Sequence, residues 1–408
     1  EALKAITDYH LGGFTLYACD YEHRTPAEIR ALMASYREAA KLNPFIAVDC
    51  EGGRVVRASK YPAFRETNFK SPRDLFAEGG YERIDADTRE KCEFLRDLGV
   101  NFNYAPVLDL SGNPECFIYD RTFSHDPDAT AIYAGTVVTA MNDCKMVGSI
   151  KHFPGYGDNV DTHTSIAHDD RTMEQFMTCD LKPFIAGIEA GAPIVMIAHN
   201  MVSCMDPDIP ASLSPAVHKL LREDLGFDGV IMTDSLDMNA ITLYTGDRAS
   251  AVQAVLSGND LLCCSTYWKQ VPAVLDAVRE GTLTHLHNAG ISSRRNGHIK
   301  LSEDADKLRV IYAHGEGWGT WNTRVQPITL KLSDANDLGA ELSKPCIKEF
   351  VRGTAVPKDQ RQLAMIRPEQ DVYETYVGRS SFTLRINVFD TYFEKSPLKK
   401  GSEGIRFV

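Results

Sequence analysis

Residues 148–165 carry most of the side chains that could do chemistry. An apolar run ends in Lys151 and His152, and a loop rich in glycine and proline then carries the pair Asp161-x-His163. Lysine and histidine can donate hydrogen bonds to hydroxyl oxygens, and a carboxylate near an imidazole can orient that ring for proton transfer. Solvated loops also contain such residues by chance. The position just after a strand-end Lys-His favours a catalytic loop.

A second candidate is Asp234, which follows the apolar segment at 229–233. A carboxylate at the end of a buried strand is costly unless it is paired or functional. Such a group can attack an electrophilic carbon and leave again, as retaining glycosidases require. The alternative interpretation is that Asp234 or Ser235 caps the following helix.

The segment at 49–57 joins a further strand-end carboxylate, Asp49, to a double-glycine turn and two arginines, Arg54 and Arg57. Carboxylates accept hydrogen bonds from sugar hydroxyls, and arginines donate to the hydroxyl oxygens. This composition suits a carbohydrate ligand. An Arg–Glu ion pair that braces the loop is the alternative.

Two further residues have two open interpretations each. Arg121 could reach the same pocket from its loop, or it could pair with its neighbour Asp120. His199 ends the apolar run at 195–199, so it could line the pocket or be a hydrogen-bonded histidine in the core. We keep both as candidate substrate-binding residues.

The elements that must position these residues alternate between strand and helix. Seven apolar runs of strand length recur, with helical patterns such as the capping box Thr25-Pro-Ala-Glu28 between them. This alternation predicts an α/β fold with a parallel sheet, either doubly wound or a (β/α)₈ TIM-type barrel. The predicted strands are 13–18, 45–49, 100–106, 148–152, 194–199, 229–234 and 260–264.

The reactive residues favour the barrel, because they follow the carboxyl ends of several different strands. No Gly-x-Gly-x-x-Gly follows the first strand, which disfavours a dinucleotide-binding sheet. Seven strands instead of eight suggest that the barrel lacks or replaces its first strand, for which a segment before Glu1 is the candidate. Beyond about Thr284 the pattern changes to short apolar pieces, such as 308–312 and 382–389, among polar stretches. We therefore expect a catalytic domain at 1–284 and an irregular C-terminal region of unknown role at 285–408.

Composition limits the partners. The 408 residues contain 44 basic and 56 acidic side chains, and the resulting net charge of −12 disfavours nucleic acid as a partner. No apolar stretch is long enough to insert into a membrane. The ten cysteines have no Cys-x-x-Cys spacing, so we expect free thiols, a cytoplasmic location, and neither a metal ion nor a cofactor. A secreted or lipoprotein form remains open if a leader precedes Glu1.

Taken together, these motifs resemble the family 3 glycoside hydrolases, and within them the bacterial β-N-acetylglucosaminidase branch. The resemblance runs to about residue 284 and is carried by five ordered segments. They are 48–57, 120–123, 151–158, 161–163 and 232–238. Two positions depart from the family pattern, Cys50, where members usually have Gln or His, and Tyr156, where they usually have His.

The resemblance implies a role for each matching residue. Asp234 would be the nucleophile that forms a covalent glycosyl-enzyme intermediate. His163 would be the general acid/base, with Asp161 as its dyad partner. The residues implied to hold the non-reducing-end N-acetylglucosamine are Asp49, Arg57, Arg121, Lys151 and His152. A histidine on a glycine-rich loop also suggests a loop that closes over bound sugar, with Gly155 and Gly157 allowing the motion.

The implied activity is hydrolysis of terminal β-linked N-acetylglucosamine with retained configuration. Muropeptides, as in peptidoglycan recycling, or chitin oligomers are the expected substrates. One alternative is a phosphorylase of β-N-acetylglucosaminides or β-glucosides, because a histidine acid/base would not repel phosphate as a carboxylate would. Another alternative is a catalytically impaired protein that still binds sugar but no longer hydrolyses it. The choice between N-acetylglucosamine and glucose, and the oligomeric state, stay open.

Overall fold

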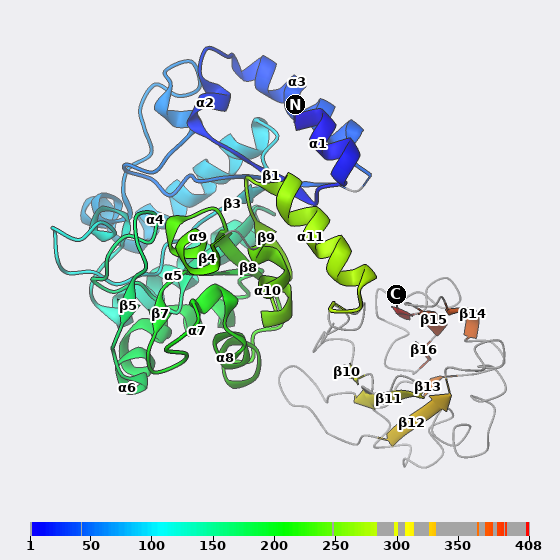
Figure 1. Cartoon of the computed structure of the whole chain (residues 1–408). Coiled ribbons are helices and arrows are strands. Elements are labelled where there is room, and N and C mark those ends of the chain that lie inside the picture. Colours follow the sequence, from blue (N-terminus) through cyan, green and yellow to red (C-terminus); the bar gives the residue numbers. More distant parts are fainter. Residues whose placement is uncertain are drawn as a thin grey trace. The chain divides into compact units, whose positions relative to one another are not determined.

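A computed structural model describes residues 2–41, 43–246 and 249–283 in full (Figure 1). The chain divides into two compact units, Glu1–Ala273 and Val274–Val408. In the second unit, beyond residue 283, only the backbone of eight strands is described. They are β10 (His298–Lys300), β11 (Lys307–Ala313), β12 (Gln326–Lys331), β13 (Met365–Ile366), β14 (Val372–Val377), β15 (Phe382–Ile386), β16 (Val388–Phe389) and β17 (Ile405–Phe407). The apolar pieces noted at 308–312 and 382–389 fall on β11, β15 and β16. The rest of the predicted C-terminal region, apart from the other strands named here, lies outside the described residues.

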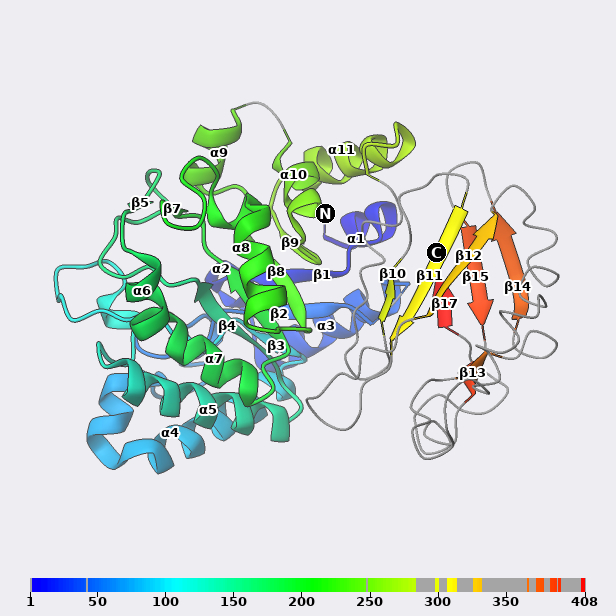
Figure 2. The same cartoon turned by 90° about the horizontal axis from the view of Figure 1, so that it is seen from below.

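Seven parallel strands form the main sheet of the first unit, and their spatial order follows the chain. They are β1 (Gly13–Leu16), β2 (Phe45–Val48), β3 (Phe102–Asn103), β4 (Val147–Phe153), β6 (Ile194–Ile197), β8 (Val230–Ser235) and β9 (Leu261–Cys263). The sheet curls like part of a barrel (Figure 2). All seven strands expected from the sequence are confirmed, and the fold is of the (β/α)-barrel type. β5 (His168–Asp169) and β7 (Met201–Val202) form a separate small parallel pair.

Helices precede β1, occupy connections between the strands and follow β9. They are α1 (Ala2–Tyr9), α2 (Ala18–Tyr21), α3 (Pro26–Ala39), α4 (Pro72–Asp97), α5 (Pro127–Asp143), α6 (Met173–Gln175), α7 (Leu181–Glu189), α8 (Pro215–Lys219), α9 (Asn239–Thr245), α10 (Ser250–Ser257) and α11 (Tyr267–Arg279). α4, α5 and α7 lie side by side, and α5 and α7 contact β4 (Figure 2).

The helix starts follow local sequence signals. The capping box before α3 is confirmed, since Glu28 N donates to Thr25 Oγ1 at 3.3 Å and Thr25 N donates to Glu28 Oε2 at 2.7 Å. Proline at the first helical position begins α3, α4, α5 and α8. In the part of the chain described in full, no helix has the length and apolar character needed to cross a bilayer.

Side chains alternate between the two faces of the sheet, because successive residues of a strand point to opposite sides. One set faces the helices and joins the large core, and the other fills the inside of the curl. The inner set is Ala47, Phe102, Tyr104, Ile194, Met196 and Met232. Burial of each large aliphatic side chain contributes roughly 1.5–3 kcal/mol. The same alternation continues at the carboxyl ends, so Asp49 after Ala47 and Asp234 after Met232 project toward the mouth of the curl.

Candidate active site

The carboxyl ends of neighbouring parallel strands bring the predicted residues to one edge of the sheet. Asp49 follows β2, Lys151 and His152 lie within the end of β4, and Asp234 lies near the end of β8. His199 follows β6. Arg57 and Arg121 come from the loops after β2 and β3, so four strands and two loops supply the site.

Five charged side chains form a continuous network at this edge. Lys151 Nζ lies 3.0 Å from Asp49 Oδ1 and 2.7 Å from Glu51 Oε1. Arg121 donates to both oxygens of Glu51, from Nε at 3.0 Å and from Nη2 at 2.9 Å. Arg57 Nη2 lies 2.7 Å from Asp49 Oδ2. Opposite charges therefore alternate through the network, and each buried charge has a partner.

The network keeps its carboxylates ionised. Burial by itself would raise the pKa of Glu51, but Arg121 and Lys151 outweigh burial and lower it to about 2. Burial also opposes ionisation of Asp49, yet Lys151 and Arg57 hold the pKa of that carboxyl well below its usual range. Burial disfavours the ammonium of Lys151, but Glu51 and Asp49 raise its pKa above the ordinary value. All these groups carry their charges at neutral pH.

Asp49 and Arg57 are the members of this network most open to a ligand. Their side chains keep 18% and 27% exposure, whereas those of Lys151 and Glu51 keep 3% each. Nε of Arg57 is buried and has no hydrogen-bond partner in the described part of the chain. The partly exposed carboxylate of Asp49 and guanidinium of Arg57 can bind hydroxyl groups of a sugar.

The pairing of Arg121 differs from the neighbour pairing considered as an alternative. Arg121 bonds Glu51, while Asp120 lies 3.2 Å from Arg54 on the exposed side of the loop. Glu51 is not among the residues predicted to bind a ligand, although it lies two residues after Asp49. A second strand-end carboxylate in the same turn was the available signal.

Asp109 holds His152 and is likewise not among the residues predicted from the sequence. Asp109 Oδ2 lies 2.6 Å from His152 Nδ1 and accepts from the His152 amide at 3.1 Å. His152 Nε2 lies 3.2 Å from Arg121 Nη2. A guanidinium can only donate, so His152 Nε2 accepts a hydrogen bond from Arg121. In the neutral ring the proton is then on Nδ1, which donates a hydrogen bond to Asp109. The signal for Asp109 was a carboxylate directly after the apolar pair Val107-Leu108.

Asp234 lies inside β8, so it does not cap the following helix. Its Oδ1 accepts from the amide of Ser235 at 2.7 Å, and the N-cap position of α9 is Met238. Burial would raise the pKa of Asp234, but His152 and His199 outweigh burial and hold it below the ordinary value. Asp234 is therefore an ionised carboxylate at neutral pH.

His199 is fully buried, and both of its ring nitrogens are used. Nδ1 lies 2.7 Å from Ser212 Oγ, and Nε2 donates to the carbonyl oxygen of Ser235 at 2.9 Å. The desolvation that accompanies burial lowers its pKa, although Asp234 opposes this. The side chain thus holds the backbone next to Asp234 and has no ring nitrogen left for a sugar hydroxyl, which fits the interpretation of His199 as a core histidine.

The loop after β4 brings Asp161 and His163 into contact. Asp161 Oδ1 accepts from the His163 amide at 2.9 Å and lies 2.7 Å from His163 Nδ1. The His163 side chain is 60% exposed. Its Nε2 has no protein partner among the residues described in full. A carboxylate on Nδ1 and an open Nε2 suit proton exchange with a bound molecule.

A hydrogen bond connects this loop to the helix that follows β8. The amide of Ala240, in α9 just after β8, donates to the carbonyl oxygen of Thr162 at 3.1 Å. The loop that carries Asp161 and His163 is therefore joined to α9, which follows the strand of Asp234.

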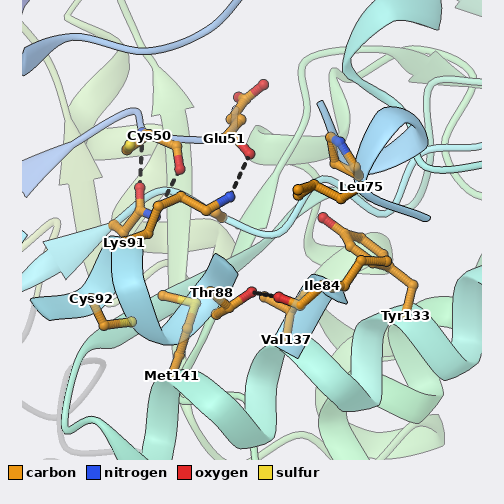
Figure 3. A pocket seen from close by; sticks show the side chains of 13 residues that line it. Cys50, Glu51, Leu75, Ile84, Thr88, Lys91, Cys92, Tyr133, Val137 and Met141 are labelled. Carbon is orange, nitrogen blue, oxygen red and sulfur yellow. Dashed lines mark hydrogen bonds between the residues drawn. The ribbon is translucent and has the colours of Figure 1, made fainter. Parts of the chain in front are cut away.

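A small cavity lies beneath the turn that carries Glu51 (Figure 3). Lys91 Nζ, from α4, donates to the carbonyl oxygen of Glu51 at 3.2 Å, and it lies 2.9 Å from Asp87 Oδ2. Asn103 binds both backbone groups of Cys50, at 2.9 and 3.0 Å. The cavity volume is about 20 Å³. Since one water molecule needs roughly 10–15 Å³, the cavity has room for one. This polar support fixes the turn from below.

Within residues 2–283, apart from the three positions left undescribed, no group of three or more His, Cys, Asp or Glu side chains is arranged to hold a metal ion.

The chain is similar to known proteins over most of its length. Residues 1–294 match the glycosyl hydrolase family 3 N-terminal domain. A beta-hexosaminidase of Xanthomonas campestris is 33% identical over 289 residues, which span 70% of this chain and 86% of the relative.

Solved structures of family 3 glycoside hydrolases have a similar fold. A glycoside hydrolase family 3 beta-N-acetylglucosaminidase from Paenibacillus sp. has a TM-score of 0.66 at 31% identity, over 71% of this chain and 56% of that chain. A family 3 glycosyl hydrolase from Mycobacterium smegmatis has a TM-score of 0.63 at 30% identity, over 71% of this chain and 88% of that chain. This chain thus spans little more than half the length of the Paenibacillus enzyme. From the family match, the identity to the relatives and the shared fold, we conclude that the chain belongs to glycosyl hydrolase family 3.

Proposed function

We propose that this protein is a retaining exo-glycosidase that removes terminal β-linked N-acetylglucosamine. The observation that carries the proposal is the hydrogen bond from the amide of Ala240, six residues after Asp234, to the carbonyl oxygen of Thr162, which lies between Asp161 and His163. It is supported by the ionised state of Asp234 and by the contact of Asp161 with His163. The names of the relatives, beta-hexosaminidase and beta-N-acetylglucosaminidase, support an N-acetylated amino sugar as the substrate. Residues 1–284 are the proposed catalytic domain.

In the proposed first step, Asp234 attacks the anomeric carbon while His163 Nε2 gives a proton to the departing glycosidic oxygen. The aglycone leaves as an alcohol, and the sugar becomes an ester of Asp234. Asp161 stabilises the imidazolium before transfer, because its carboxylate lies against Nδ1. In the second step the neutral imidazole accepts a proton from water, whose oxygen attacks the anomeric carbon and releases Asp234. Two inversions retain the configuration.

The charged network is proposed to hold the sugar during both steps. Asp49 and Arg57 are the groups open to hydroxyls, while Lys151, Arg121 and His152 lie directly behind or beside them. Since the network is already paired and charged, little reorganisation is needed when the ring develops positive charge. His199 is proposed to contribute by holding the backbone beside Asp234.

Natural substrates of two classes fit the proposal, muropeptides in peptidoglycan recycling and chitin oligomers. We also propose a cytoplasmic location. The nine cysteines in the region described in full are free, as is usual in a reducing compartment.

The test is the release of nitrophenol from a panel of nitrophenyl β-glycosides, with and without inorganic phosphate. We expect turnover of the N-acetyl-β-glucosaminide, much slower turnover of the β-glucoside, and release of free β-configured sugar, which NMR detects before mutarotation. Formation of sugar 1-phosphate in the presence of phosphate would show that the enzyme is a phosphorylase and not a hydrolase. Sugar binding without any release of nitrophenol would indicate a binding protein.

A further inference from the structure

Tyr156 and Thr162 form a buried contact inside the loop that carries the dyad. Thr162 lies between Asp161 and His163, and it is fully buried although both of its neighbours are solvent-accessible. Its Oγ1 shares a hydrogen bond with the phenolic oxygen of Tyr156, which is 2% exposed. The exposed dyad is thus held by the one buried side chain between its two members.

Each partner is fixed from its other side by a different part of the site. The amide of Tyr156 donates to Asp109 Oδ1 at 2.8 Å, and its ring meets the His152 ring edge-on at 5.2 Å. The carbonyl oxygen of Thr162 accepts from Ala240 at 3.1 Å. The contact therefore joins the sugar-binding side of the site to the helix that follows Asp234.

The phenol of Tyr156 keeps its proton at neutral pH, so it can donate or accept in the hydrogen bond with Thr162. Burial and the nearby charge of Asp234 raise the pKa of Tyr156 far above its usual range. Removal of either hydroxyl would leave the other buried and unpaired, at a cost of about 1–3 kcal/mol. The loop would then shift, and a displacement of about 1 Å in a catalytic group can slow a reaction by roughly 10²-fold.

We propose that Tyr156 and Thr162 are positioning residues whose hydroxyl–hydroxyl contact holds His163 at the glycosidic oxygen. This inference rests on the proposed function, in which His163 is the acid/base. Neither hydroxyl takes part in a bond change. Their contact fixes the loop backbone at Thr162, and this backbone fixes the position of His163, the next residue.

The kinetic test uses Tyr156→Phe, Thr162→Val, the double variant and the conservative Thr162→Ser. Each is measured for kcat and KM on N-acetyl-β-glucosaminides with a good and a poor leaving group. We expect kcat on the poor leaving group to fall by roughly 10- to 100-fold in both single variants, with KM and the good substrate changed by less than about 3-fold. The double variant should be no slower than the slower single variant, and Thr162→Ser should recover most of the rate.

Matched controls remove comparable hydroxyl bonds elsewhere. Tyr81→Phe loses a bond to the carbonyl oxygen of Ala129 at 3.0 Å, and Thr130→Val loses one to that of Asp126 at 2.8 Å. Both should keep wild-type kinetics. The proposal is overturned if the site variants match these controls, if both substrates slow equally, or if the two single effects multiply in the double variant.

Amide hydrogen exchange over residues 158–166 gives a readout that does not need turnover. We expect faster exchange in Tyr156→Phe and Thr162→Val than in the wild type or the controls. If the wild type hydrolyses no N-acetylglucosaminide, the proposed function fails, yet faster exchange still supports the loop contact. Unchanged exchange in both variants overturns the contact whatever the activity.

Discussion

Lys151 Nζ and Glu51 Oε1 lie 2.7 Å apart, and each side chain keeps only 3% of its surface exposed. A buried ion pair of this kind tolerates the loss of one partner poorly, because the remaining charge stays desolvated. Arg121 adds a second cation to Glu51, and Asp49 adds a second anion to Lys151. The charge state of this network is therefore tied to the stability of the fold.

Acid should unfold the protein partly through Glu51. The pKa of Glu51 is lowered from 4.5 to about 2 in the folded chain. A lowered pKa stabilises the fold above the unfolded value, and this stability is lost as the pH falls through 4.5 toward 2. We expect Tm, followed by calorimetry, to decline in this window. Glu51→Gln should lower Tm at pH 7 and flatten the acid decline, and a variant with the wild-type profile would contradict the assignment.

Asp234 and His163 should respond differently to leaving-group quality. Asp234→Asn should reduce kcat by roughly 10³-fold or more on every nitrophenyl or alkyl N-acetyl-β-glucosaminide, because no covalent intermediate can form. His163→Ala should slow poor leaving groups by roughly 10²- to 10⁴-fold and good ones far less, since only the former need a proton. Equal losses on both substrate types would remove His163 from the acid role.

Lys91 should matter for stability more than a surface lysine or arginine does. Lys91→Met leaves Asp87, with 2% of its side chain exposed, without its cation, so we expect a loss of about 3–5 kcal/mol in urea unfolding. Arg30→Met, which breaks the exposed pair with Asp97, is the control and should cost less than about 1 kcal/mol. The double variant Lys91→Met/Asp87→Leu should recover most of the loss. Equal effects of Lys91→Met and Arg30→Met would refute this role.

Gly155 should not tolerate a side chain. Its φ is +122°, and a Cβ there would lie 2.8 Å from Asp180 Oδ1. We expect Gly155→Ala to destabilise the fold by roughly 1–3 kcal/mol in urea unfolding. Gly135→Ala, in the middle of α5 with no atom within 4 Å of the added Cβ, should instead stabilise by about 0.5–1 kcal/mol. A neutral Gly155→Ala would show that the loop adapts freely.

Local pattern in the sequence was enough to predict the seven strands and the cap of α3. Each strand is a short apolar run, and the Thr25–Glu28 box lies within one turn of chain. The contact between Asp161 and His163 also spans only two residues. Such features depend on neighbours in the chain, so the order of residue types determines them.

The partners of the buried charges depended on the tertiary structure. Glu51 meets Arg121 across 70 positions, and Asp109 meets His152 across 43. Nothing in the spacing distinguishes Glu51 from a carboxylate that braces its own loop, or predicts that Asp120 would pair with Arg54 instead of Arg121. The curl of the sheet brings the ends of different strands together. A buried charge is stable there only when it is paired with an opposite charge that the fold places next to it. The sequence by itself therefore determined which residues could act, while only the folded chain decided which of them hold one another in place.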